Sequence, residues 1–247
     1  MALWIQEQSR RSTRLVLIGW PRRLARRFDL IVTSAQYRAG DHSNVLQLGL
    51  PLMRVDHAAV EAATRAWQPR FAALPRPLTA LLVGGPTKPV RFDAAVARDL
   101  ALRTAAIRDG GTIYATTSRR TPAAVVEALG ASLPPGSRLF RWRPDAPDNP
   151  YTALLGLADR FVVTSDSITM GVEVARLGRP LAIYSLPPAP GRLLRRVASR
   201  RDLDAVPALL IDQELAVRLG EPFHSTARAA PDELERVAAR IRALFDP

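Results

Sequence analysis

Between residues 77 and 187, the hydrophobic positions form short continuous runs that alternate with longer amphipathic segments. Continuous apolar runs predict strands that are buried on both faces, and amphipathic segments predict helices. The predicted strands are 78–83, 112–116, 139–142, 161–164 and 180–184, and the predicted helices are 92–109, 122–130, 149–159 and 167–177. Strands that alternate with helices in this way predict an α/β fold, with a parallel sheet covered by helices on both faces.

The first part of the chain contains strands of the same kind, but too few of them. After a short helix over residues 2–9, the runs RLVLIG (14–19) and FDLIVT (28–33) predict two apolar strands. Two such strands cannot close a core by themselves, and a parallel sheet covered on both faces would continue upstream of them. We therefore expect residues 1–56 to be the remnant of an N-terminal Rossmann-like domain whose first part is truncated.

Prolines mark the remaining boundaries. A helix over residues 57–74 is ended by Pro75 and Pro77, and a proline-rich linker at 186–190 precedes a basic helix. A last helix is predicted from Pro231 to Phe245. The expected organisation is therefore a remnant domain (1–56), a connecting helix (57–76), a complete Rossmann-like domain (77–187) and C-terminal helices (188–247).

Several classes of protein are disfavoured by composition. The 247 residues include no cysteine, so there is no disulfide framework and no thiolate metal site. The histidines at 42, 57 and 224 show no ligand spacing, and we expect neither a metal nor a cofactor. No apolar run is long enough to span a bilayer, and no signal-peptide pattern opens the chain. We expect a cytoplasmic protein, or one held peripherally at the inner membrane.

The net charge of +12 has two interpretations. Almost all the basic residues are arginines, clustered at 10–14, 22–27 and 195–201, and such clusters suit phosphates, anionic lipid or nucleic acid. Codon bias in a GC-rich genome, which favours Arg, Ala, Pro and Gly together, would produce the same excess. Nucleic acid is not expected as a partner, because no recognition motif is present and no aromatic residue interleaves the last cluster.

Candidate chemistry lies in the connections that follow the predicted strands. Ligands of open parallel sheets bind beyond the carboxyl ends of the strands, and four polar loops or helix starts fall there. The candidate ligand-binding residues are Gly84, Gly85, Thr116, Thr117, Ser118, Arg119, Arg120, Asn149, Tyr151, Thr164, Ser165, Asp166, Ser167 and Glu173. No catalytic residue can be assigned among them.

Each candidate also has a purely structural interpretation. Gly84-Gly85 would let the backbone approach a ligand, or would simply form a tight turn. The hydroxyls and guanidiniums of residues 116–120 suit a phosphate beside a helix start, although Thr121 could cap the helix that Pro122 opens.

The two later loops also have both a functional and a structural interpretation. Asn149 suits an N-cap, whereas Tyr151 could stack on a base. Residues 164–167 form the densest set of small polar groups in the chain and are the most specific local signal. Glu173 would contact a ligand, face solvent or pair with Arg176.

Five segments occur in an order typical of one known family: VGGP (83–86), TTSRRTP (116–122), DNPY (148–151), TSDSITM (164–170) and GVEVARLGRPLAIYSLP (171–187). Together with RLVLIGWPR (14–22), FDLIVTSAQY (28–37) and EPF (221–223), they resemble the bacterial relatives of the plant "elongated mitochondria" fission factor. The resemblance implies a GT-B-like fold of two Rossmann-type domains. It also implies that family members begin with a glycine-rich segment and several strands before the region that matches Ala2.

The resemblance implies two alternative functions. In the first, residues 77–187 form the nucleotide-sugar-binding half. The loops at 116–118 and 164–167 then face the diphosphate, and Glu173 faces the ribose or sugar. Any glycosyltransferase of this type would need no metal, because Arg119 and Arg120 could offset the charge of the leaving diphosphate. In the second, the chain is a non-catalytic adaptor that docks on a protein or an anionic membrane surface, as the plant member does.

Overall fold

The computed structural model describes residues 1–9, 12–21, 23–40, 42–87, 90–189, 202–224 and 228–245. These residues form two compact units. Unit 1 takes its described residues from Met1–Met53, Ala198–Val206 and Pro231–Pro247, and unit 2 from Arg54–Val197 and Pro207–Ala230. The basic helix expected after residue 190 lies outside the described residues.

Unit 2 is built on a six-stranded sheet in the order β6-β5-β4-β7-β8-β9, and all neighbouring strands are parallel. Its strands are β4 (Leu78–Val83), β5 (Thr112–Thr117), β6 (Arg138–Phe140), β7 (Arg160–Thr164), β8 (Leu181–Tyr184) and β9 (Val217–Arg218). The chain runs outward from β4 through β5 to β6, then returns to place β7 on the other side of β4. This order is that of a doubly wound Rossmann sheet, and its direction reverses between β4 and β7.

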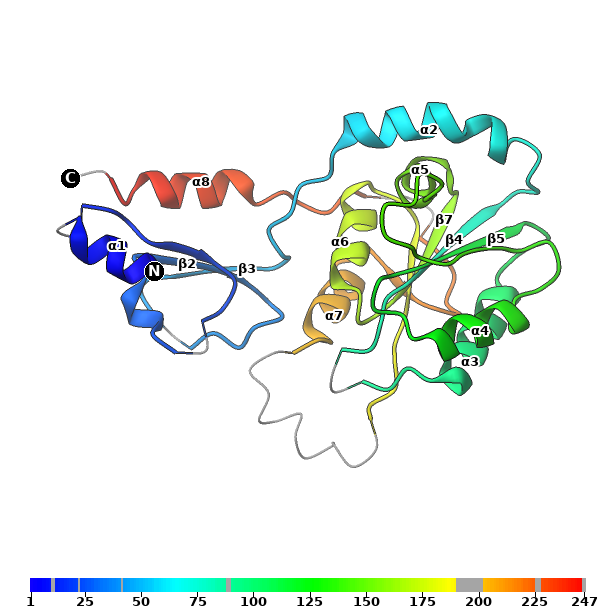
Figure 1. Cartoon of the computed structure of the whole chain (residues 1–247), viewed down its shortest axis with the longest axis horizontal. Coiled ribbons are helices and arrows are strands. Elements are labelled where there is room, and N and C mark those ends of the chain that lie inside the picture. The colour runs from blue at the N-terminus through cyan, green and yellow to red at the C-terminus, as the bar shows by residue number, and fades with distance from the viewer. Residues whose placement is uncertain are drawn as a thin grey trace. The chain divides into compact units, whose positions relative to one another are not determined.

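Helices cover both faces of this sheet (Figure 1). The helices of unit 2 are α2 (His57–Phe71), α3 (Ala94–Ala106), α4 (Ala123–Ser132), α5 (Tyr151–Leu157), α6 (Ile168–Arg176) and α7 (Ala205–Asp212), whose first two residues fall in unit 1. Helix α2 packs on α5, and α3 packs on α4. The side chains of Asp56 and Asp93 cap α2 and α3 by accepting hydrogen bonds from first-turn amides.

The α/β fold with parallel sheets is confirmed, and the predicted strands of the 77–187 region are all present. All six residues of β4 are buried, as a continuous apolar run requires. Strand β9 extends the sheet beyond β8, although no strand was expected after residue 187. Its two residues form too short a run to be recognised in the sequence.

Unit 1 contains a three-stranded parallel sheet in the order β1-β2-β3. Its elements are α1 (Ala2–Gln8), β1 (Val16–Ile18), the 3₁₀ turn η1 (Ala25–Arg27), β2 (Leu30–Ser34), β3 (Val45–Leu48) and α8 (Leu234–Arg242). Val237 of α8 is 2% exposed and packs with Leu30, Val32 and Leu48 of the sheet. The last helix of the chain therefore helps to close the core that two strands could not close.

One strand of this unit was not predicted, and the expected burial of another is wrong. Strand β3, which follows residue 44 and pairs with β2, was not predicted from the sequence. Strand β1 was expected to be buried on both faces, but Val16 is 36% and Ile18 63% exposed. Val16 and Ile18 are two residues apart and so lie on the same face of β1, and within the described residues that face is exposed.

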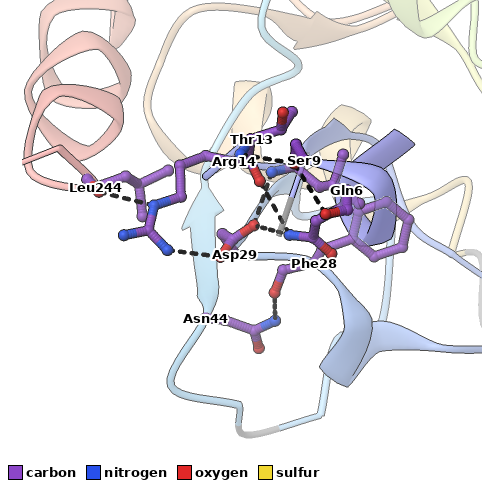
Figure 2. Close-up of polar contacts among 9 residues, drawn as sticks. Gln6, Ser9, Thr13, Arg14, Phe28, Asp29, Asn44 and Leu244 are labelled. Atoms are coloured by element: carbon purple, nitrogen blue, oxygen red, sulfur yellow. Dashed lines mark hydrogen bonds and ion pairs between the residues drawn. The ribbon is translucent and has the colours of Figure 1, made fainter. Parts of the chain in front are cut away.

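The carboxylate of Asp29 joins several segments of unit 1 (Figure 2). Its Oδ2 accepts hydrogen bonds from the Gln6 side-chain amide at 2.8 Å and from the Leu15 amide at 2.7 Å. Its Oδ1 lies 3.5 Å from the Arg14 guanidinium, which in turn donates to the carbonyl of Leu244 after α8. One side chain therefore ties α1 and the start of β1 to β2.

We expect Asp29→Ala to lower the stability of unit 1 by roughly 1–3 kcal/mol, because it leaves partly buried donors without an acceptor. Amide hydrogen exchange is the suitable measurement, since the two units need not unfold together. The Leu15 amide should exchange faster in the variant, while the amides of β4 should keep their protection. Glu7→Ala, which removes an exposed carboxylate from α1, is the control. Unchanged exchange at Leu15 would contradict the prediction.

Candidate functional site

The loops that follow β4 and β7 are bonded together at the point where the strand order reverses. The Gly84 amide donates to Thr164 Oγ1 at 2.9 Å. The Gly85 amide donates to Asp166 Oδ2 at 2.7 Å. Crevices at such reversal points are where open α/β sheets bind their ligands.

The loop after β5 joins the same cluster through Thr121. The Thr121 hydroxyl donates to the Gly84 carbonyl at 2.5 Å and accepts from the Ser118 amide at 2.9 Å. The structural alternative for Thr121, a cap on the next helix, is wrong: α4 begins after Pro122 and has no side-chain cap. Thr121 was not among the candidate residues, yet it connects the loop after β5 to the loop after β4. We call the loops 84–87, 118–121 and 164–167 the rim.

The two glycines are required by packing within the rim. A Cβ on Gly84 would lie 2.5 Å from Asp166 Oδ2, and a Cβ on Gly85 would lie 2.3 Å from the backbone carbonyl carbon of Arg120. No side chain fits at either position without movement of its neighbour. These glycines therefore let the three loops approach one another closely, whether or not a ligand also contacts their backbone.

Several predicted hydroxyls are already used inside the protein. Thr117 Oγ1 accepts from the Trp142 amide at 2.9 Å and so holds the chain that leaves β6. Ser165 Oγ accepts from the Leu186 amide at 3.0 Å and holds the chain that leaves β8. Thr116 is only 2% exposed. These residues shape the rim, but their side chains are not directed freely toward solvent.

Two guanidiniums of the rim are exposed. Arg120 donates to Thr87 Oγ1 at 2.6 Å. Neither Arg119 nor Arg120 has a carboxylate partner within the described residues. Exposed guanidiniums beside loop hydroxyls suit a phosphate, which they bind by charge-assisted and bidentate hydrogen bonds.

Asp166 is the unusual group of the rim. It is 5% exposed, and its Oδ1 has no hydrogen-bond partner. Burial raises the pKa of its carboxyl, while the Thr164 hydroxyl, the Gly85 amide and the charge of Arg120 act in the opposite direction. A buried acceptor without a donor carries a free-energy cost, and a ligand hydroxyl would remove it.

Helix α6 begins beside Asp166. Its N-cap, Ser167, makes no side-chain hydrogen bond to the first turn. The first amides of this helix therefore have no acceptor in the N-cap side chain. The rim thus combines donors that suit an anion with one buried acceptor that suits a hydroxyl.

The remaining candidates lie at the start of α5 and within α6. Tyr151 donates its hydroxyl to Glu173 Oε2 at 2.5 Å, so Glu173 is bonded to Tyr151, and the surface interpretation is wrong. Burial raises the pKa of Glu173, and burial together with the neighbouring carboxylate raises the pKa of Tyr151. Asn149 is exposed, and its Oδ1 accepts from the Tyr151 amide at 3.0 Å. Asn149 therefore stabilises the turn into α5, although the N-cap itself is Pro150.

Two kinds of feature are absent from the described residues. In the described residues, no group of three or more His, Cys, Asp or Glu side chains is arranged to hold a metal ion. Among the same residues, no helix has both the length and the apolarity needed to cross a membrane.

The sequence is similar to that of one described family. A family model described as "Mitochondrial fission ELM1" matches residues 1–245. The curated Mitochondrial fission protein ELM1 of Arabidopsis thaliana is 28% identical over 191 residues, which is 76% of this chain and 44% of that protein. The match thus spans less than half the length of the plant protein.

Solved glycosyltransferase structures show a more distant likeness. A UGT transferase from Siraitia grosvenorii in complex with UDP is 16% identical, with a TM-score of 0.42 over 90% of this chain and 53% of that one. UGT2 of Phytolacca americana, complexed with UDP-2fluoro-glucose and pterostilbene, is 12% identical, with a TM-score of 0.41 over 87% and 44%. Because this likeness is weak, the fold assignment depends on the sheet order of the chain itself.

Proposed function

The chain belongs to the mitochondrial fission ELM1 family, and on this basis we propose that unit 2 binds a nucleoside diphosphate or nucleotide-sugar at the rim. The observation that carries the proposal is the joining of the loops after β4, β5 and β7 at the reversal point of the sheet. Such an arrangement offers fixed backbone donors and exposed guanidiniums in one place. Both features favour a diphosphate.

Two kinds of protein group at the rim suit two different parts of the ligand. The diphosphate is proposed to contact Arg119, Arg120 and Ser118, away from the buried carboxylate of Asp166. Asp166 Oδ1 is proposed to accept a hydrogen bond from a ribose or sugar hydroxyl. A phosphate placed against Asp166 would be repelled while that carboxylate is ionised.

The adaptor alternative has less support. The arginines at 10, 11, 22, 195, 196, 200 and 201, which make up most of the basic clusters, lie outside the described residues. No feature of the described residues favours a docking surface on a membrane over a ligand site at the rim. Matches between glycosyltransferases and this chain concern the fold alone, and no catalytic role is proposed.

We expect UDP or GDP to stabilise the protein, and uridine or guanosine to do so much less, because the diphosphate supplies most of the proposed contacts. At a ligand concentration of 100 Kd, linkage predicts about 2.7 kcal/mol of stabilisation, which is measurable as a rise in Tm. Arg120→Gln should weaken diphosphate binding by about tenfold or more, since it removes a charge-assisted contact.

Arg98→Gln is the matched control, because Arg98 is an exposed arginine on α3 outside the rim. Isothermal titration should give the same Kd for this variant as for the parent. The proposal fails if neither diphosphate binds the folded parent. It also fails if Arg120→Gln binds as tightly as Arg98→Gln.

A further inference from the structure

A hollow lies on unit 2, away from the rim. It has a volume of about 600 Å³ and is bordered by α2, β5, β6 and the segment after β6. Aromatic side chains contributed by three elements line it: Trp67 and Phe71 from α2, Tyr114 from β5 and Phe140 from β6. The volume falls in the range of pockets that hold small organic molecules. We call this hollow the aromatic groove; none of the rim residues lines it.

The aromatic side chains of the groove form an ordered stack. Phe71 is 2% exposed and stacks on Tyr114, with ring centroids 5.3 Å apart and an interplanar angle of 12°. Trp67 meets Phe71 edge-on at 6.0 Å. Because Phe71 is buried and fixes its two neighbours, the half-buried rings of Trp67 and Tyr114 form a preorganised apolar surface.

Two of the arginines that line the groove are available to a ligand, although the charge of Arg70 also helps to lower the pKa of Asp148. Arg70 lies over the Trp67 ring at 4.7 Å, and Arg138 is the first residue of β6. In the part of the chain that the structure describes, neither forms an ion pair. Their neighbours differ: Arg141 pairs with Glu127 at 2.5 Å, and Arg143 pairs with Asp148 at 2.6 Å. Of the four arginines that line the groove, Arg70 and Arg138 are therefore the two available to an anion.

The Tyr114 hydroxyl supplies a third polar group. It makes no hydrogen bond with any described residue, and it belongs to a side chain that lines the groove. Burial raises the pKa of Tyr114, so its hydroxyl keeps its proton at neutral pH and can donate. Aromatic surface, two free guanidiniums and a free donor thus occur within one hollow.

We propose that the aromatic groove binds a small organic anion that joins a flat ring to a phosphate or carboxylate. The ring packs against Trp67 and Tyr114, and the anionic group is held by Arg70 and Arg138 with a hydrogen bond from Tyr114. A guanidinium stacked on an indole is already oriented for such an anion. This site is independent of the nucleotide site proposed at the rim, because the two share no residue.

Phenyl phosphate is the probe, with inorganic phosphate and phenol as its two halves. In isothermal titration, phenyl phosphate should bind the parent protein more tightly than either half does. The indole N–H signal of Trp67 in NMR spectra, assigned through Trp67→Phe, should shift on addition of phenyl phosphate. Arg120→Gln, at the rim, should leave this shift in place, so that the result can be interpreted whether or not the rim binds a nucleotide.

Arg138→Gln and Arg70→Gln should each weaken phenyl phosphate binding by about tenfold or more. Arg65→Gln, on the same helix as Arg70, should leave it unchanged, because Arg65 does not line the groove. All three arginines are exposed, and unchanged Tm values will show that the variants fold. The proposal is overturned if the parent shows no saturable binding. It is also overturned if phosphate binds as well as phenyl phosphate, or if the Arg138 and Arg70 variants bind like the parent.

Discussion

Gly85→Ala will destabilise unit 2 by about 3 kcal/mol or more, because the new methyl group meets backbone atoms that cannot move independently. The added Cβ would lie 2.3 Å from both the carbonyl carbon and the carbonyl oxygen of Arg120. Relief requires the loops after β4 and β5 to separate. That separation would stretch the bonds of Gly85 to Asp166 and of Gly84 to Thr121.

Thermal and urea unfolding of unit 2 will measure the effect. For a chain of this length, a loss of 3 kcal/mol corresponds to a fall in Tm of roughly 6–12 °C. The same variant should lose binding of UDP and GDP at temperatures where it is still folded, because the rim is displaced. A variant that keeps its parent's stability within about 0.5 kcal/mol would contradict the close packing of these loops.

Gly171→Ala is the matched control for a glycine in the same unit. Gly171 is buried in α6, but its added Cβ would lie 3.8 Å from Leu210 Cδ1, which is an ordinary contact. Alanine is also the better helix former by roughly 0.5–1 kcal/mol. We therefore expect Gly171→Ala to be neutral or stabilising and to bind the diphosphates like the parent protein.

The comparison of these glycines shows what the sequence could predict at the site. The loops after β4, β5 and β7 were expected at one edge of the sheet, because parallel strands that alternate with helices place all their carboxyl ends together. The reason for Gly85 could not be predicted. It depends on Arg120, whose backbone reaches the glycine only after a strand has paired and a helix has packed.

The sequence also could not predict which hydroxyls of the site are available to a ligand. Thr117 and Ser165 look as available for a ligand in the sequence as Ser118 does, yet they accept from Trp142 and Leu186, which follow neighbouring strands. Strand register decides which hydroxyl lies beside an unpaired amide, and register is a tertiary property. Sequence patterns therefore located the rim but could not separate the side chains that build it from those that face outward.

Short or edge elements were the least predictable part of the fold. β4 is a buried central strand and its apolar run is unmistakable, whereas β9 has two residues and β3 has four with a polar Gln47 among them. The packing of α8 against β2 and β3 joins segments about 190 residues apart, and no local pattern encodes such a contact. The aromatic groove was missed for the same reason, since its residues come from three separate segments.

Tyr151→Phe will lower the stability of unit 2 by about 1.5–3 kcal/mol at neutral pH, the range for a hydrogen bond to a charged group. The lower part of the range is expected, because both partners are half-buried. The variant removes the donor that Glu173 Oε2 accepts from at 2.5 Å and leaves the apolar ring in place. The variant leaves the Glu173 carboxylate, whose ionised form is already disfavoured by burial, without this donor.

The pH dependence of the Tyr151→Phe penalty shows whether that penalty comes from the charge of Glu173 or from lost packing. Burial raises the pKa of Glu173 above its ordinary value of 4.5, and the bond from Tyr151 partly opposes this rise. A raised pKa in the folded state means that the favourable contribution of the neutral carboxyl is complete below pH 4.5 and is lost as pH rises through the folded pKa. Tyr151→Phe raises that pKa further. Its penalty should therefore be small in acid and should grow as Glu173 ionises.

Glu173→Gln completes a double-mutant cycle that separates charge from packing. With glutamine at 173 there is no ionisation, so the penalty of Tyr151→Phe should be smaller at pH 7 and nearly independent of pH. Urea unfolding of the four proteins between pH 4 and pH 8 provides the measurement. If the penalty of Tyr151→Phe were equally large in both backgrounds and flat with pH, it would have to come from lost packing. The half-buried carboxylate of Glu173 within α6 would then not be held in its ionised form by Tyr151.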